Sequence, residues 1–342
     1  MILISGATGF IGTHLLKGLC ENNAQGIRAL YRSDDKKEYT IQFLKTFCSS
    51  EDKNKIDTIE WLKADILNIP ELEEAYKGIT LVFHCAAWVG NSSRHRKMMR
   101  KVNIEGTANM VNLAISHKVE KFCHVSSTAA LGYYGHTNVV DENAPRDSEK
   151  YSSFYSISKY GAEMEVWRAS QEGLGVVIVN PGIILGAGFF EDGSGKIFQK
   201  VINGNSFYIN KRTGFVYVND VIEFMIKIVY SPLKNERYIL VSQSLSFKTV
   251  MDFIAETFKV KKPKIRVRKW MLYIVWFIQK ILGLFKPLNL QITINTISKI
   301  NKQTEYDNSK SEALFDFEYT SIKKAIDYIY KDYKTLQKQF LK

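Results

Sequence analysis

The chain has 342 residues, of which 45% are hydrophobic and 24% charged, and its formal net charge is +12. This length and balance exclude a disordered or fibrous protein and allow one large or two ordinary domains with a sizeable core. The positive charge favours phosphates or anionic lipids as partners. The lysines are spread widely and form no basic arm, so we expect no nucleic-acid partner.

The cysteines show neither a CxxC spacing nor a metal-ligand pattern. We expect all four to be reduced thiols in or near the core of a cytoplasmic protein, and we expect no metal site; they are Cys20, Cys48, Cys85 and Cys123. The first residues, MILISGATGF, lack the basic segment of a signal peptide, so none is expected.

The first half of the chain alternates short β-rich runs with helical patterns. Strands are predicted at 2–5, 27–31, 58–63, 81–85, 122–126 and 176–180, with helices near 10–23, 71–77, 103–117 and 155–172. This alternation predicts a parallel, doubly wound sheet, and continuous apolar runs such as TLVFHCAA suit strands covered on both faces. The expected fold is α/β of the Rossmann type.

The pattern becomes irregular after Pro181, with the Gly-rich loop GAGFFEDGSGK. Strands are predicted at 214–218 and 237–242, with a helix at 219–230 capped by Asn219 or Asp220, and the chain from about 245 is mostly helical. We therefore assign 1–180 and about 214–244 to a dinucleotide-binding domain. The remaining segments, 181–213 and 245–342, form a smaller, mostly helical substrate domain.

Residues 270–285, WMLYIVWFIQKILGLF, stand apart because they open with nine uninterrupted apolar residues and follow the basic run 261–269. The segment is shorter than the ~20 residues of a membrane span. It is interpreted either as a buried helix or subunit contact, or as an interfacial helix on anionic lipid at the inner face of a membrane.

The N-terminal stretch ISGATGFIGTHLL spaces Gly6, Gly9 and Gly12 three residues apart, directly after a strand and at the start of a helix. Glycine permits a tight turn and a close backbone approach. The helix N-terminus offers free amides and the positive end of its dipole to a pyrophosphate. In this context the glycines predict dinucleotide binding.

The second strand ends in ALYRSDDKK. A carboxylate at its end would bind the ribose 2′-hydroxyl of NAD, but the sequence has Arg32 there, which suits the 2′-phosphate of NADP. NADP is therefore the expected cofactor. Asp34 and Asp35 leave NAD open, and a solvated basic loop is the alternative interpretation.

Tyr155 and Lys159 lie four residues apart in YSSFYSISK, so they share a face of the predicted helix. The spacing alone has little value, because it recurs at Tyr230/Lys234, Tyr306/Lys310, Tyr319/Lys323 and Tyr330/Lys334. Only the first pair follows a Ser-Ser-Thr strand end and precedes the strand that leads into Pro181.

Taken together, these segments resemble the extended short-chain dehydrogenase/reductase family over nearly the whole chain. The matching pieces are GATGFIG, ADI (64–66), HCAA (84–87), NIEGT (103–107), VSSTAALG (125–132), YSISK (155–159), NPGIILG (180–186) and FVYVNDV (215–221). In the family, homodimers are common, so a homodimer is expected by analogy.

The resemblance implies roles for individual residues. Asp65 would hold the adenine amino group beside Ile66, and Ala86 and Ala87 would pass close to the cofactor ribose. Asn103 would brace the active-site backbone, Ser127 would bind the substrate oxygen, Tyr155 would move the proton, and Lys159 would hold the nicotinamide ribose. Thr8, Phe10, Ile11, Pro181, Ile183 and Ile184 complete the expected cofactor-binding set.

The chemistry of these side chains suits such roles. A free tyrosine has a pKa of about 10, and the Lys159 cation and an oxidised nicotinamide both favour the phenolate, so the pKa of Tyr155 is expected nearer to working pH. Ser127 and Tyr155 are two donors for one developing oxyanion. Ser126 and Thr128 are the alternatives to Ser127, and a merely polar strand end is the alternative to a catalytic role.

The reaction class is narrowed by Ala129 and Ala130, which stand where a related dehydratase has an Asp-Glu pair. The stretch NPGIILGAG looks more like dihydroflavonol reductases and 3-beta-hydroxysteroid dehydrogenases than like sugar-nucleotide enzymes. We expect an NADP-dependent reductase or dehydrogenase of a small hydrophobic ketone or secondary alcohol.

The candidate walls of its apolar pocket are Trp88, Val89, Phe189, Phe190, Phe215 and Tyr217. The alternatives are a nucleotide-sugar epimerase with bound NAD and a non-catalytic NADPH-binding protein.

Overall fold

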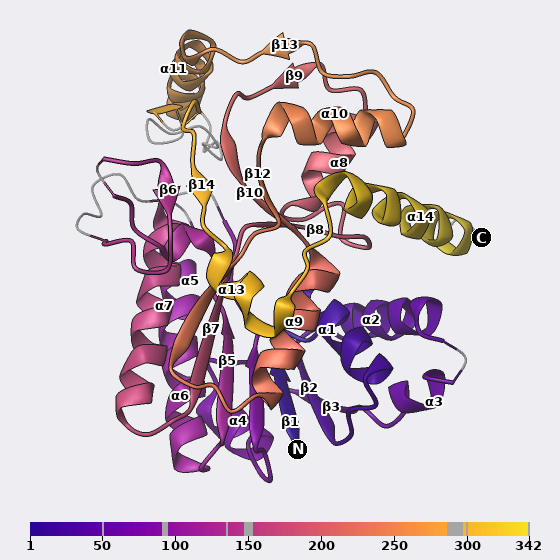
Figure 1. Ribbon diagram of the computed structural model, residues 1–342, viewed down its shortest axis with the longest axis vertical. Helices are drawn as coiled ribbons and strands as arrows, with labels where there is room; N and C mark the ends of the chain where they lie inside the picture. Colours follow the sequence, from indigo (N-terminus) through magenta and orange to yellow (C-terminus); the bar gives the residue numbers. More distant parts are fainter. Residues whose placement is uncertain are drawn as a thin grey trace.

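The computed structural model describes residues 1–49, 51–90, 95–134, 136–146, 153–285, 297–298 and 300–340. A seven-stranded parallel sheet flanked by helices forms the lower part of Figure 1, and a smaller group of strands and helices lies above it. The α/β fold of the Rossmann type is therefore confirmed.

The large sheet comprises β1 (Ile2–Ser5), β2 (Ile27–Tyr31), β3 (Glu60–Lys63), β4 (Leu81–His84), β5 (Lys121–Val125), β7 (Val176–Pro181) and β11 (Glu236–Leu240). Its helices are α1 (Phe10–Glu21), α2 (Asp34–Phe47), α3 (Lys53–Ile56), α4 (Ile69–Ala75), α5 (Arg96–Arg100), α6 (Gly106–Ser116), α7 (Phe154–Gln171) and α9 (Val218–Tyr230). All strands predicted for the first half are present.

The strands of the large sheet run in the order β11-β7-β5-β4-β1-β2-β3, and all neighbours are parallel. The chain winds outward from β1 to β3 and then starts again on the other side of β1 with β4. Ligands of open α/β sheets bind where the winding reverses, at the carboxyl ends of the strands. The glycine motif follows β1 and therefore lies at this switch point.

Both faces of the sheet are buried because successive strand residues point to opposite faces. Leu3 and Val82 pack with α4, α6 and α7, whereas Ile4 and Phe83 pack with α1 and α9. Figure 1 shows α6 and α7 on one side of the sheet and α1 and α9 on the other. Burial on both faces accounts for the continuous apolar runs of the sequence.

The smaller part contains β8 (Ile183–Leu185), β10 (Arg212–Tyr217) and β12 (Gln243–Ser246) in one sheet, and the pairs β9 (Phe207–Tyr208) with β13 (Ile265–Arg266) and β6 (Val139–Val140) with β14 (Glu305–Tyr306). Its helices are α8 (Gly195–Ile202), α10 (Phe247–Thr257), α11 (Lys269–Phe285), α13 (Ser309–Ala313) and α14 (Ile322–Phe340). Three short helical turns complete the description: η2 (Lys101–Glu105) lies between α5 and α6, η3 (Thr128–Ala130) follows β5, and η4 (Leu314–Asp316) follows α13.

The segment 214–244 divides between the two parts. α9 packs against the large sheet and β11 extends it, but β10 pairs with β8 and β12 in the small sheet. The expected grouping of 214–218 with the large sheet therefore needs correction. The physical reason is that β11 occupies the edge beside β7, which leaves β10 no partner there.

The predicted cap of α9 also needs correction. The helix begins at Val218 with Tyr217 as its N-cap residue, so neither Asn219 nor Asp220 caps it. Asp220 is instead buried, and its carboxylate accepts hydrogen bonds from the backbone N–H and the hydroxyl of Thr320 at 2.9 and 2.8 Å. This contact ties α9 to the segment that precedes α14.

The helix α11 does not fit the interpretation of 270–285 as a buried helix, because large apolar side chains such as Trp270, Ile274 and Phe277 are exposed on it. Within the described chain, no helix combines the length and the apolar character that crossing a bilayer requires. The four cysteines are free thiols; three are buried and Cys85 is half-buried.

Candidate functional site

Glycines shape the turn between β1 and α1. Gly6 has a φ of +69°, and a Cβ there would lie 2.6 Å from the backbone N of Ala86. A Cβ on Gly12 would lie 2.2 Å from the Gly6 carbonyl oxygen, so α1 approaches the turn only without a side chain. The Gly9 N–H donates to that carbonyl at 3.0 Å and closes the turn. The result is a backbone cradle at the switch point that added side chains would fill.

The helix α1 opens directly onto this cradle. Its N-cap residue, Gly9, has no side-chain oxygen, so the first-turn amides and the positive dipole end face outward. Thr8, Phe10 and Ile11 are half-buried around the turn. This donor set fits a pyrophosphate, and a dinucleotide cofactor would be held here by the cradle.

Arg32 and Asp65 meet at the carboxyl ends of β2 and β3. Arg32 Nη1 donates to Asp65 Oδ2 at 3.3 Å, and both side chains are exposed. The other carboxylate oxygen of Asp65 accepts from the backbone of Leu67 at 2.9 Å. Asp34, the alternative ribose ligand, pairs with Lys63 at 2.7 Å, and this hydrogen bond lowers the pKa of Asp34. Arg32 is thus placed beside the expected adenosine position.

The remaining expected cofactor residues lie at the same edge. Ala86 and Ala87 follow β4 and are half-buried, and Ile66 is buried after β3. Pro181 ends β7, and Ile183 and Ile184 form β8. The β8 end comes close to the cradle, since a Cβ on Gly186 would lie 2.7 Å from the ring of Phe10.

Asn103 lies in the π turn η2 and braces the backbone after β4. Its Oδ1 accepts from the Trp88 N–H at 2.6 Å, and its Nδ2 donates to the Trp88 carbonyl at 3.0 Å and to Ser158 Oγ at 2.9 Å. Ser158 in turn donates to the carbonyl of Tyr155 at 2.8 Å. One buried amide therefore joins the loop after β4 to the first turns of α7.

Ser127 follows β5, and Tyr155 and Lys159 lie one turn apart near the start of α7, which Ser153 caps with its side-chain oxygen. The side chains of Tyr155 and Ser127 lie close enough to interact. The buried Lys159 ammonium donates to the Val125 carbonyl at 2.7 Å. The three predicted residues are thus brought together at the carboxyl edge of the sheet.

The pKa values of this group follow from burial. Burial raises the pKa of Tyr155 to about 12, and the interaction with Ser127 acts in the opposite direction. In the protein alone the pKa of Tyr155 is therefore raised and not lowered, because the Lys159 ammonium donates to a backbone carbonyl and desolvation of the phenolate dominates. Burial lowers the pKa of Lys159 to about 8, while Glu163 and Cys85 act to raise it. At neutral pH the pair is a phenol and an ammonium.

Glu163, which the sequence analysis missed, lies fully buried one turn after Lys159. Its carboxylate accepts hydrogen bonds from Ser126 and, at 2.6 Å, from Asn180, and it pairs with Arg237 at 3.4 Å. Because Ser126 is turned toward Glu163, it does not stand in for Ser127. The available signal was an acidic residue four positions after Lys159 on the same helix face.

Tyr306 is a second residue that the sequence analysis did not assign to the site. It comes from β14 and its side chain interacts with Thr128, Thr213 and Tyr133, yet burial outweighs these interactions and raises its pKa. Its spacing to Lys310 looked like that of the catalytic pair, but Lys310 instead pairs with Glu236 at 2.6 Å. No sequence signal indicated that this distant strand reaches the end of β5.

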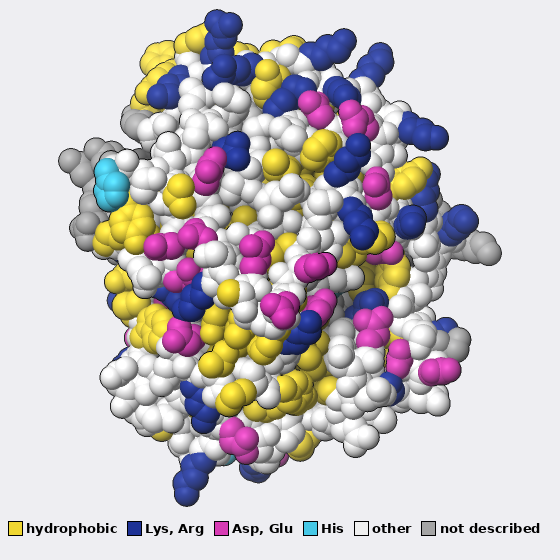
Figure 2. Space-filling model, viewed as in Figure 1, with side chains coloured by type: hydrophobic (Ala, Val, Ile, Leu, Met, Phe, Trp, Pro, Cys, Tyr) yellow, Lys and Arg dark blue, Asp and Glu magenta, His cyan; other side chains and the backbone are white. Residues whose placement is uncertain are grey.

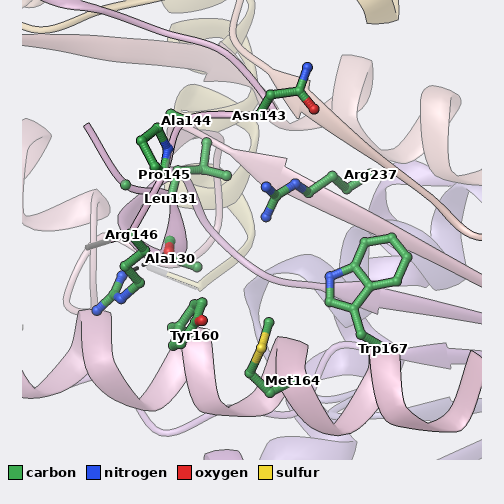
Figure 3. A pocket seen from close by; sticks show the side chains of 11 residues that line it. Ala130, Leu131, Asn143, Ala144, Pro145, Arg146, Tyr160, Met164, Trp167 and Arg237 are labelled. Carbon is green, nitrogen blue, oxygen red and sulfur yellow. Dashed lines mark hydrogen bonds between the residues drawn. The ribbon is translucent and has the colours of Figure 1, made fainter. Parts of the chain in front are cut away.

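Two cavities lie beside the site. One, of about 310 Å³, is on a neighbouring face of α7. Figure 3 shows Tyr160, Met164 and Trp167 pointing into it opposite Arg237. Another of about 370 Å³ is lined by residues of α1, α2 and α14.

Several of the expected pocket walls pack against other aromatic side chains. Phe215 is fully buried against Phe247, and Tyr217 lines the cavity beside α14. Phe189 packs on Phe10, Tyr39 and Phe43, and Phe190 packs on Phe198 and Tyr333. The aromatic residues of the Gly-rich loop therefore pack between α1, α2 and the C-terminal helix. Trp88 is half-buried and Val89 is exposed, and both lie in the loop after β4.

His84, the last residue of β4, contacts Ser5 Oγ at 2.6 Å and Thr107 Oγ1 at 2.9 Å and is fully buried. Burial lowers its pKa to about 3. Among the described residues, no three histidine, cysteine, aspartate or glutamate side chains gather as a metal site would require.

Known proteins resemble this chain over most of its length. A Synechocystis sp. protein, named provisionally as a dihydroflavonol 4-reductase, is 27% identical over 94% of this chain and 91% of its own. The UDP-glucose 4-epimerase of Vibrio cholerae is 26% identical over 72% of each chain. A solved structure titled gox2253 superposes with a TM-score of 0.79 at 25% identity, covering 99% of this chain and 98% of its own.

The family model described as Male sterility protein matches residues 4–230, which include the cradle, Asn103 and the Ser127, Tyr155 and Lys159 group. The chain therefore belongs to this NAD-binding family, within the extended short-chain dehydrogenase/reductase superfamily.

Proposed function

We propose that the protein is an NADP-dependent oxidoreductase that interconverts a hydrophobic ketone and its secondary alcohol. The observation that carries the proposal is the meeting of the Ser127 and Tyr155 side chains beside the buried Lys159 ammonium. This group lies at the carboxyl edge of the sheet that also bears the glycine cradle. Support for reduction of a carbonyl comes from the reductase relative and from Ala129 and Ala130, which supply no acid or base for elimination.

Each side chain has one task in this reaction. A bound nicotinamide nucleotide would supply or accept the hydride. In the reductive direction Tyr155 donates its proton to the carbonyl oxygen, and its raised pKa keeps that proton in place at neutral pH. Ser127 donates a hydrogen bond to the same oxygen as negative charge develops. Lys159 holds the nicotinamide ribose, and Asn103 keeps the first turns of α7 in position.

NADP is proposed as the cofactor because Arg32 stands at the end of β2, where a carboxylate would select NAD. The guanidinium already binds a carboxylate oxygen of Asp65 at 3.3 Å, so it is oriented toward the expected adenosine position. A 2′-phosphate at the adenosine position would replace Asp65 as the partner of Arg32, or would bind Arg32 together with Asp65.

The decisive variant is Tyr155→Phe. Loss of the general acid should lower kcat for ketone reduction by about 10²-fold or more. NADPH affinity, followed by fluorescence titration, should change by less than about twofold. The matched control is Tyr160→Phe, on the same helix but facing the cavity of Figure 3, which should retain turnover. Turnover that survives in Tyr155→Phe would show that another group donates the proton.

The second candidate is epimerisation of a nucleotide-linked sugar, which the relationship to an epimerase of Vibrio cholerae favours. Screening the purified protein against hydrophobic ketones with NADPH, and against UDP-sugars with NAD, separates the two candidates. Turnover of a UDP-sugar without net cofactor consumption would replace the reductase assignment. Tight NADPH binding with no turnover of either class would favour a non-catalytic role.

A further inference from the structure

The exposed face of α11 is apolar, which reverses the usual arrangement of a helix on a soluble protein. Most exposed apolar residues of α11 follow one another at helical spacing and form a continuous apolar stripe, defined as Trp270, Tyr273, Ile274, Phe277, Ile278 and Ile281; Val275, 40% exposed, is a further exposed apolar residue of the helix. Trp270 and Phe277 are 58% and 59% exposed. The more buried side of the same helix carries Met271, Leu272, Trp276 and Gln279. The stripe therefore faces away from the part of the protein that α11 packs against.

Basic side chains flank the N-terminal end of the stripe. All are exposed, and they are Lys261, Lys262, Lys264, Arg266, Arg268 and Lys269. Within the described chain, only Lys262 among them forms an ion pair, with Glu256. The sequence contains no aspartate or glutamate between Glu256 and Glu305. The segment that carries α11 and the basic run therefore brings no carboxylate of its own.

Figure 2 shows hydrophobic and basic side chains gathered at the upper end of the molecule, where Figure 1 places α11 and β13. An interfacial helix buries its apolar face at the boundary of headgroups and acyl chains while lysine and arginine bind lipid phosphates. Tryptophan and tyrosine, here at positions 270 and 273, are the side chains enriched at that boundary.

From these features we propose that the apolar stripe of α11 seats the protein on the surface of an anionic membrane. The helix lies along the surface, with the stripe inserted and the basic run 261–269 against the phosphates. The charge complementarity selects an anionic bilayer as the partner, because a second copy of this chain would bring an equally basic surface into contact. The proposal is independent of the reaction at Tyr155.

Flotation of the full chain with lipid vesicles tests the proposal. Vesicles of phosphatidylcholine with about one third phosphatidylglycerol should carry the protein upward, vesicles of phosphatidylcholine alone should not, and high salt should weaken the binding. Phe277→Asp should lower the fraction bound at least about tenfold, since it places a charge in the stripe. The matched control is Tyr230→Asp, at the far end of α9, where the tyrosine is 57% exposed; it should float like the unchanged protein.

The flotation and sedimentation results separate membrane binding from contact between two copies. The proposal is overturned if the unchanged protein does not float with anionic vesicles. It is also overturned if Phe277→Asp floats as well as the unchanged protein. Analytical ultracentrifugation tests the alternative that a second copy of this chain covers the stripe. A dimer that Phe277→Asp dissociates, without any vesicle binding, would identify the stripe as a contact between two copies instead. NADPH titration of both variants verifies that they remain folded, whatever the outcome of the flotation.

Discussion

Neutralising Glu163 should change the pH at which the enzyme loses activity. Glu163 is buried one helical turn after Lys159, and its charge acts to raise the pKa of that lysine, which burial has lowered to about 8. Glu163→Gln retains an oxygen that accepts from Ser126 and Asn180, whereas the contact of Arg237 with the other oxygen is lost, because an amide NH2 cannot accept a hydrogen bond. The variant therefore removes one negative charge near Lys159 and keeps the contacts with Ser126 and Asn180.

The size of the effect follows from helix geometry. Side chains four positions apart on a helix are about 6 Å apart, and two unit charges at that distance interact by about 3 kcal/mol at an effective dielectric constant of about 20. That energy corresponds to about two pH units. Arg237, at 3.4 Å from the carboxylate, and the burial that raises the pKa of Glu163 both reduce the negative charge acting on Lys159. We expect about half the full effect, so activity should fall off about one pH unit lower than in the unchanged protein.

The assay is the pH profile of kcat/KM for NADPH-dependent reduction, together with the dissociation constant of NADPH over the same range. Without Glu163 the ammonium of Lys159 loses its proton earlier as the pH rises, so the alkaline limb should move from about 8 to about 7. Glu165→Gln is the control, because Glu165 pairs with Arg168 at 3.0 Å on the same helix and should leave the limb in place. An unmoved limb in Glu163→Gln, with normal turnover at low pH, would refute the reasoning, since Glu163 would then carry no charge that Lys159 senses.

Three further changes test the cofactor cradle, the cofactor preference and the C-terminal helix. Gly12→Ala would bring a methyl group 2.2 Å from a backbone oxygen, so fluorescence titration should show NADPH binding at least about tenfold weaker; unchanged affinity would place the pyrophosphate elsewhere. Arg32→Ala should weaken NADPH about tenfold or more and NADH less than about twofold, and tighter binding of NADH than NADPH by the unchanged protein would contradict the role of Arg32. Burial raises the folded-state pKa of Asp332 from 3.8 to about 6, so its stabilising contribution is present below about 4 and lost as the pH rises through about 6. Asp332→Asn should therefore stabilise the protein against urea by about 1–2 kcal/mol at neutral pH, after allowance for solvent screening, and by almost nothing near pH 4; equal gains at both pH values would exclude this charge effect.

The sequence was sufficient where structure depends on near neighbours. The six strands of the first half were predicted because each is a short apolar run between helical patterns, and both faces of the sheet are buried. The glycine cradle was predictable because the close approach of Gly12 to Gly6 is a property of one tight turn. The shared face of Tyr155 and Lys159 followed in the same way from helical periodicity.

Contacts between distant segments were not predictable from one sequence. The pattern at 214–218 indicated a strand but not its partners. In the structure β11 forms the edge of the large sheet, and β10 pairs with β8 and β12. Asp220 looked like a helix cap, but its partner, Thr320, lies a hundred residues away. Tyr306 reaches Thr128 from β14 for the same reason, since its position depends on the packing of the whole smaller part.

The sequence by itself indicated the glycine turn and the pair of Tyr155 and Lys159, because glycine spacing, helix periodicity and strand ends are local properties. Only the tertiary structure decided their charge states and surroundings. Burial raises the pKa of Tyr155 where the sequence suggested a lower one, and Glu163 acts on Lys159 only because the fold removes water from both. The apolar run of α11 is likewise visible in the sequence, but the exposure of its side chains depends on which elements pack against the helix. Solvent access is a property of the assembled fold, and it sets both the electrostatics of the site and the surface offered to a partner.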